Sequence, residues 1–146
     1  MIFKLCVGMT SARKTEKQNI AFMELYKSVD VRIRERFGTA DGVSEYIRRL
    51  EEVVECGKAK ARSGEARQDY RMLKHLRWAR NMLAHEASYS DEILKDGDME
   101  WLEDFGRNLR QSKDTLSLLK RSKSGSGKKP GKLSLLGRIR RLLGKG

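Results

Sequence analysis

Apolar residues recur at steps of three and four in four segments of the chain, which is the spacing that one face of an α-helix requires. These segments cover residues 15–37, 41–56, 65–87 and 99–119. Asp41 is placed to cap the start of the second segment. No stretch alternates apolar and polar residues as a half-buried strand does. The pattern predicts an all-α fold, a four- to five-helix up-and-down bundle over residues 15–119, with residues 1–14 as an N-terminal extension.

The first and the last of these segments have long apolar faces. The face of the first consists of Ile20, Phe22, Met23, Tyr26, Val29, Ile33 and Phe37. The face of the last consists of Trp101, Leu102, Phe105, Leu109, Leu116 and Leu119. With 146 residues and 38% hydrophobic content, we expect these faces to meet in the core of a single domain.

The positive charge of the chain is concentrated at its C-terminal end. The formal net charge is +12. Residues 120–146 contain ten Lys or Arg and no Asp or Glu, which leaves 22 basic and 20 acidic residues in the first 119. The bundle is therefore close to neutral, and the high isoelectric point describes the tail.

The tail divides into two parts. Residues 120–131 are rich in Ser, Gly and Lys and are expected to form a flexible basic linker. Residues 132–146 place leucines on one face of a short basic amphipathic helix, if they are ordered. The tail residues expected to contact a polyanion or a membrane are Lys128, Lys129, Arg138, Arg140, Arg141 and Lys145. Nonspecific RNA binding, docking on an anionic membrane and docking on an acidic protein partner all fit this composition.

Several classes of protein are disfavoured by the sequence. Cys6 and Cys56 belong to no CxxC pair or Cys/His cluster, so we expect no metal and no other cofactor. The linker lacks the GxxxxGK[ST] spacing of a P-loop. The apolar start, residues 1–8, is too short for a secretion signal or a membrane span. We expect a cytoplasmic protein, peripheral to the membrane if the tail docks there.

The third segment carries an arginine and a histidine on different faces. Taking Leu76 as the centre of its apolar stripe, Arg80 falls about 40° away, within the stripe, and His85 about 180° away. A guanidinium in an apolar stripe requires a carboxylate from another helix or a position where the bundle opens into a cleft. His85 has no core role on its own helix, so it is either a solvated surface residue or a functional one.

The stretch Leu76-Arg77-Trp78-Ala79-Arg80-Asn81-Met82-Leu83-Ala84-His85-Glu86 resembles the signature of HEPN (higher eukaryotes and prokaryotes nucleotide-binding) domains. That signature is an arginine, a polar residue that is often Asn, a few further positions and a histidine. The next helical segment, with Trp101 and Phe105 on its inner face, also resembles the family, and the resemblance extends over residues 22–119.

The resemblance implies a metal-independent endoribonuclease that works as a homodimer, with the two motifs facing one cleft. Its substrate, RNA, supplies its own nucleophile, the 2′-hydroxyl. In this scheme His85 transfers protons near neutral pH, and Arg80 holds the phosphate oxygens. Asn81 orients the imidazole or bonds the phosphate. Two-fold symmetry would supply the second histidine of an acid–base pair.

Three residues around the motif are candidates for RNA contacts. Lys74 and Arg77 are placed to contact the RNA backbone, and Trp78 to stack on a base. Solvated charge is the alternative for the first two, and a dimer-interface aromatic for the third. His75, the only other histidine, has no motif partner and is expected to flank the apolar stripe.

Three functions remain open on this reading. The first is a ribonuclease, acting as a toxin or a phage-defence effector on tRNA or mRNA. The second is a non-catalytic HEPN module that binds a nucleotide or a partner protein, such as an antitoxin or a nucleotidyltransferase. The third is an adaptor that binds a membrane or nucleic acid through its tail, with the bundle as a dimerising scaffold.

Overall fold

The computed structural model describes residues 2–56 and 62–125, and the side chains of residues 11–56 and 62–123. This part of the chain is all-helical, which confirms the predicted helical bundle. Its helices are α1 (Ile2–Phe37), α2 (Gly42–Cys56), α3 (Ser63–His85), α4 (Asp98–Arg110) and α5 (Thr115–Gly125).

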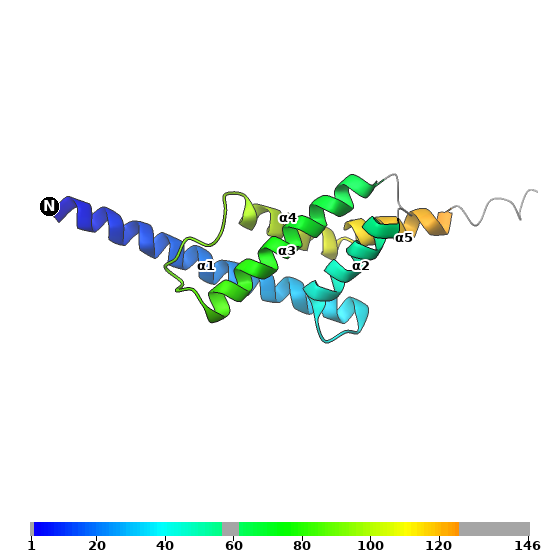
Figure 1. Cartoon of the computed structure of the whole chain (residues 1–146), viewed down its shortest axis with the longest axis horizontal. Helices are drawn as coiled ribbons and strands as arrows, with labels where there is room; N and C mark the ends of the chain where they lie inside the picture. The colour runs from blue at the N-terminus through cyan, green and yellow to red at the C-terminus, as the bar shows by residue number, and fades with distance from the viewer. Residues whose placement is uncertain (1, 57–61, 126–146) are drawn as a thin grey trace, which may run out of the picture.

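Helix α1 forms the long axis of the molecule, and its N-terminal part extends beyond the other helices (Figure 1). Helices α2 and α4 both pack against α1, and α3 packs along α2. The first four helices supply the largest fully buried apolar side chains, which are Phe22, Ile33, Val43, Tyr46, Leu50, Leu73, Leu76, Leu102 and Leu109. Burial of these side chains is the main stabilising contribution to the fold.

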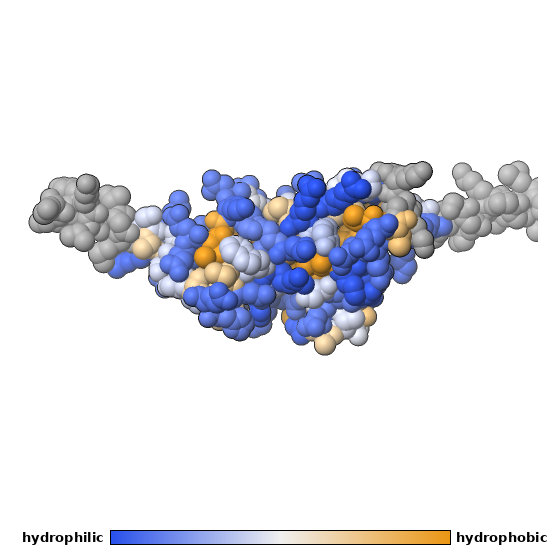
Figure 2. Space-filling view, viewed as in Figure 1, coloured by the Kyte–Doolittle hydropathy of each residue, from blue (hydrophilic) through white to orange (hydrophobic). Residues whose placement is uncertain are grey.

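The outer surface of the bundle is mainly hydrophilic on the face shown in Figure 2, with small separate hydrophobic areas. Among the side chains that the structure describes, the exposed large hydrophobic ones are Ile20, Trp78 and Tyr89. Ile20 was expected on the inward face of α1, but it is 46% exposed, so that expectation is wrong. No helix in the described part of the chain is both long and apolar enough to cross a bilayer.

Element boundaries differ from the sequence pattern at both ends. Residues 2–14, expected as an extension, continue α1 as a helix. Helix α5 runs to Gly125, so the expected start of the linker at residue 120 falls inside a helix. The tail residues Lys128, Lys129, Arg138, Arg140, Arg141 and Lys145 lie outside the described residues.

The expected single helix over residues 99–119 is wrong, because the chain turns between α4 and α5. The N–H of Lys113 donates to the carbonyl of Asn108, and that of Ser112 to the carbonyl of Leu109. This is the Schellman pattern that ends a helix. It requires a left-handed residue, and Ser112 has φ 53° there. A left-handed conformation costs a residue other than glycine roughly 1–2 kcal/mol.

Asp114, the residue before α5, is why the chain turns here. Its carboxylate accepts hydrogen bonds from the hydroxyl of Tyr46 (2.7 Å) and from Nη1 of Arg36 (2.8 Å). It also accepts from the backbone N–H and the hydroxyl of Ser117, as an N-cap does. Burial alone would raise the pKa of Asp114, but the hydrogen bonds from Arg36, Ser117 and Tyr46 outweigh it and hold that pKa below its usual value. The turn is thus fixed to α1 and α2 through one buried carboxylate.

Helix α2 is capped by a residue of α1. The N–H groups of Gly42 and Val43 donate to Oδ1 of Asp30, at 3.1 and 2.9 Å. The capping oxygen therefore belongs to Asp30, and the expected cap at Asp41 is wrong. The helices approach so closely here that a Cβ on Gly42 would lie 2.1 Å from the carbonyl oxygen of Asp30.

We expect Asp114→Asn to lower the free energy of unfolding by about 3 kcal/mol, because the neutral amide at this buried position cannot pair with Arg36 or accept from all its present donors. Asp104→Asn is the matched control. Asp104 pairs with Arg107 on the surface, so its loss should cost no more than about 0.5 kcal/mol. Urea unfolding at neutral pH measures both. Equal stabilities of the two variants would show that the buried network is not what holds the turn.

Candidate functional site

Arg80 lies in a cleft between α1 and α3 that the start of α2 closes. The cleft has a volume of about 580 Å³. Of the two surroundings that the sequence left open for this arginine, the structure favours the cleft. Nη1 of Arg80 donates to the amide oxygen of Asn81 at 3.1 Å, and no carboxylate among the described residues forms an ion pair with Arg80.

The lining of the cleft carries both signs of charge. Its basic residues are Lys27, Arg34, Arg77 and Arg80, and its acidic residues are Glu24, Asp30 and Asp41. Asp30 caps α2 through one oxygen and lies 3.0 Å from Nε of Arg34 through the other, at an angle that makes an ion pair but no hydrogen bond. Arg77 and Arg80 form no ion pair with a carboxylate in the described part of the chain, so their guanidinium groups are available to a phosphate group.

Tyr26 places a neutral hydroxyl in the same cleft. Burial, assisted by the negative charge of Asp30, raises the pKa of Tyr26 to about 12, although Arg80 and Arg77 act in the opposite direction. At neutral pH the phenol therefore remains protonated and available as a hydrogen-bond donor.

His85 is the last residue of α3, and its side chain is exposed. It does not line the cleft, and no described residue forms a hydrogen bond or an ion pair with it. Five helical residues separate it from Arg80, which corresponds to about 7.5 Å along the axis and about 140° around it. Within one chain, Arg80 and Asn81 lie together in the cleft, and His85 lies apart from them.

The loop that follows His85 is held against α1 by Asn19, which the sequence analysis missed. Nδ2 of this buried side chain donates to the carbonyls of Tyr89 and Asp91, both at 2.8 Å. The Tyr89 side chain thereby reaches the cleft. The signal in the sequence is a polar residue three positions before Phe22, in the apolar stripe of α1.

His75 has a structural partner. Its Nε2 lies 2.7 Å from Oδ2 of buried Asp98, the first residue of α4, and its ring stacks on Trp78. The same carboxylate oxygen accepts the N–H of Lys95. His75 is therefore not the free flank residue that its spacing suggested but a tie between α3 and α4.

The three expected RNA contacts are divided between two surfaces. Arg77 lines the cleft, and its Nη1 donates to the hydroxyl of Ser44 at 3.4 Å. Lys74 and Trp78 face outwards: Lys74 lies 5.0 Å above the ring of Tyr70, and Trp78 is half exposed. Only Arg77 shares the surroundings of Arg80.

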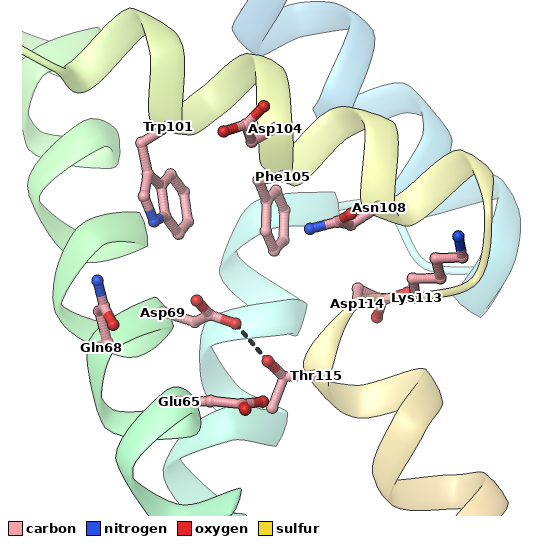
Figure 3. A pocket seen from close by; sticks show the side chains of 10 residues that line it. All are labelled: Glu65, Gln68, Asp69, Trp101, Asp104, Phe105, Asn108, Lys113, Asp114 and Thr115. Atoms are coloured by element: carbon pink, nitrogen blue, oxygen red, sulfur yellow. Dashed lines mark hydrogen bonds between the residues drawn. The ribbon is translucent and has the colours of Figure 1, made fainter.

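A second cavity, of about 210 Å³, lies between α3, α4 and the start of α5 (Figure 3). Its acidic lining residues are Glu65, Asp69, Asp104 and Asp114. The rings of Trp101 and Phe105 form one wall, stacked with centroids 5.1 Å apart. The described side chains nevertheless contain no group of three His, Cys, Asp or Glu residues arranged to hold a metal ion. The charged lining of this cavity is thus mainly acidic, with Lys113 as its basic residue.

Asp69 is the acidic residue of this cavity that has a raised pKa. It accepts the hydroxyl of Thr115 at 2.6 Å but has no cation partner among the described residues. Burial raises its pKa, and the negative charges of Glu65 and Asp114 raise it further. A carboxylate whose pKa is higher in the folded state binds its proton more tightly there, so it weakens folding as pH rises through that pKa.

We therefore expect Asp69→Asn to raise the melting temperature by a few degrees at pH 7, since the amide oxygen still accepts from Thr115 without a buried charge. The gain should disappear near pH 3, where Asp69 is protonated in both states. Thermal unfolding followed by circular dichroism at the two pH values measures this. An Asn variant that melts below the parent protein at pH 7 would contradict it.

Comparison with known proteins yields one family. No curated protein and no solved structure matches the chain significantly. A family of unknown function, DUF6548, matches residues 20–134, which include the cleft, helices α3, α4 and α5 around the second cavity, and the Arg80–His85 segment. The match spans most of the sequence, and the chain therefore belongs to the DUF6548 family.

Proposed function

We propose that the chain is a metal-independent endoribonuclease that uses Arg80, Asn81 and His85. The observation that carries the proposal is a half-buried guanidinium in a cleft without a carboxylate partner in the described structure, on the same helix as an exposed histidine. An arginine in this position is available for a phosphate group. The resemblance of the segment to HEPN domains supports the same chemistry.

In the proposed reaction, the 2′-hydroxyl of RNA attacks the adjacent phosphorus and displaces the 5′-oxygen of the next nucleotide. The products are a 2′,3′-cyclic phosphate and a 5′-hydroxyl. Arg80 binds the non-bridging oxygens, on which negative charge develops. Asn81 holds the guanidinium of Arg80 in place, and His85 transfers the proton.

A homodimer would explain why Arg80 and His85 lie in different surroundings within one chain. In one chain the histidine lies outside the cleft that contains the arginine, so a site built from one chain would lack its proton-transfer group. A second copy, related by a two-fold axis near the end of α3, would bring its His85 towards the first cleft. Trp78, exposed on the same helix, is then an interface residue rather than a base-stacking one.

We infer that the enzyme works in the cytoplasm, as a toxin or phage-defence effector, with its basic tail recruiting RNA or an anionic membrane. An antitoxin or a nucleotidyltransferase is the proposed protein partner. The second candidate function is binding of a nucleotide without cleavage. It is favoured by one observation, the absence of His85 from the cleft.

Cleavage of total RNA by the purified full-length chain, with a chelator present, tests the proposal. We expect Arg80→Ala and His85→Ala each to reduce the rate at least about 100-fold, because each removes charge stabilisation or proton transfer. Helical content should not change, since neither side chain is in the core.

Two control variants separate catalysis from general effects. Arg71→Ala removes an exposed arginine from the same helix, and His75→Asn removes the other imidazole. Both should cleave like the parent protein. If Arg80→Ala and His85→Ala also cleave like the parent, the nuclease proposal fails. If no variant and no parent protein cleaves while RNA still binds, the non-catalytic function is correct.

Mixing the two inactive variants tests the proposed dimer. If each site takes its arginine from one chain and its histidine from the other, an equal mixture should regain about a quarter of the parent rate, because half of the dimers carry one intact site of two. A mixture that stays inactive would contradict a site divided in this way.

A further inference from the structure

A third cavity lies where the end of α1 meets α2 and the start of α5. Its volume is about 580 Å³. The polar groups lining it are three cations, Arg36, Arg49 and Lys120, and two hydroxyls, Ser112 and Ser117. No carboxylate lines it, and it shares no lining residue with the Arg80 cleft. Among the described cavities it is the one whose charged lining is wholly cationic.

Some of these donors are already used by the fold. Arg36 binds Asp114 and the carbonyl of Leu109, and the hydroxyl of Ser117 donates to Asp114. Nε of Arg49 donates to Glu45, and its guanidinium lies 3.7 Å from the ring centroid of Phe37. These contacts hold the cationic wall in place without filling the cavity.

Other donors are unused. The terminal nitrogens of Arg49, the ammonium of Lys120 and the hydroxyl of Ser112 have no hydrogen-bond partner among the described residues. They belong to three different elements, α2, α5 and the turn between α4 and α5. Donors that converge from several sides suit a ligand with several acceptor oxygens rather than a planar carboxylate.

The residue type at position 112 is a second observation, because the turn itself requires only a positive φ there. In the described chain, the other residues with positive φ are Gly38 and Gly97, for which this conformation is without strain. A serine is held in the same region only here, in the turn that faces the cavity. Residues strained in this way gather at ligand sites, where the side chain has a use that offsets the strain. The Ser112 hydroxyl is the group that glycine would lack.

We propose that this cavity is a phosphate-binding site in which Lys120, Arg49 and Ser112 contact the phosphate oxygens. The phosphate belongs either to a free phosphorylated compound or to the backbone of RNA. The proposal does not depend on the nuclease proposal, because the two sites have no residue in common.

An NMR titration of the full-length chain with inorganic phosphate, in phosphate-free buffer at low salt, tests the site. We expect saturable shifts of the backbone amides of Ser112 and Ser117. Lys120→Gln should weaken binding at least about fivefold. Lys113→Gln is the matched control, since it removes the same charge from the neighbouring turn, at a residue that lines the acidic cavity instead (Figure 3). It should weaken binding less than about twofold.

Ser112→Gly keeps the proposal testable if a charge variant folds poorly, because glycine relieves the positive φ. We expect this variant to melt at a higher temperature yet bind phosphate about threefold more weakly. Unchanged binding by Ser112→Gly, equal effects of the two lysine variants, or shifts confined to residues 126–146 would overturn the site. A short single-stranded RNA that displaces phosphate from the same amides assigns the site to an RNA backbone. Failure to displace it assigns the site to a free phosphate compound.

Discussion

The buried carboxylate of Asp114 is the constraint on which the rest of the structure depends. Its side chain is fully buried, so the charge is tolerable only while Arg36, Tyr46 and Ser117 all remain bonded to it. Because its pKa is lowered in the folded state, its contribution to stability is present above the pKa of an unfolded aspartate and is lost as pH falls through the lower, folded value. The hydrogen bonds of Asp114 fix the turn between α4 and α5 against α1 and α2. This turn lies between the acidic cavity of Figure 3 and the cationic cavity lined by Arg49.

The arginines of the bundle differ in whether they have a carboxylate partner, although the net charge of the bundle is close to zero. Many surface arginines pair with a carboxylate: Arg34 with Asp30, Arg62 with Glu65, and Arg107 with Asp104. In the cleft, Arg77 and Arg80 have no carboxylate partner among the described residues, and in the cationic cavity the terminal nitrogens of Arg49 have none. Unpaired guanidinium groups in a hollow favour the binding of phosphate groups.

The parts of the fold that follow from local spacing were predictable from the sequence. Helices α2 and α3 have apolar stripes bounded by polar stretches, so their positions followed from the spacing. The position of Arg80 within the apolar stripe of α3 also indicated the cleft that the structure shows there. The break before α5 was missed because apolar spacing continues from Leu109 to Leu116 across the turn. Its signal was local: Asp114 is of a residue type that caps helix N-termini, and it stands just before the apolar residues of α5. The partner of His75 is 23 residues away across a loop, a distance over which periodicity carries no information.

The capping of α2 by Asp30 has a consequence for how the chain folds. An isolated helix of this length is marginal in water, and the first turn of α2 obtains its acceptor only when α1 has formed and docked. Helix α1 in turn cannot close on α2 unless residue 42 lacks a side chain. The cap and the close packing of α1 on α2 therefore depend on each other, and a side chain at position 42 would disrupt both at once.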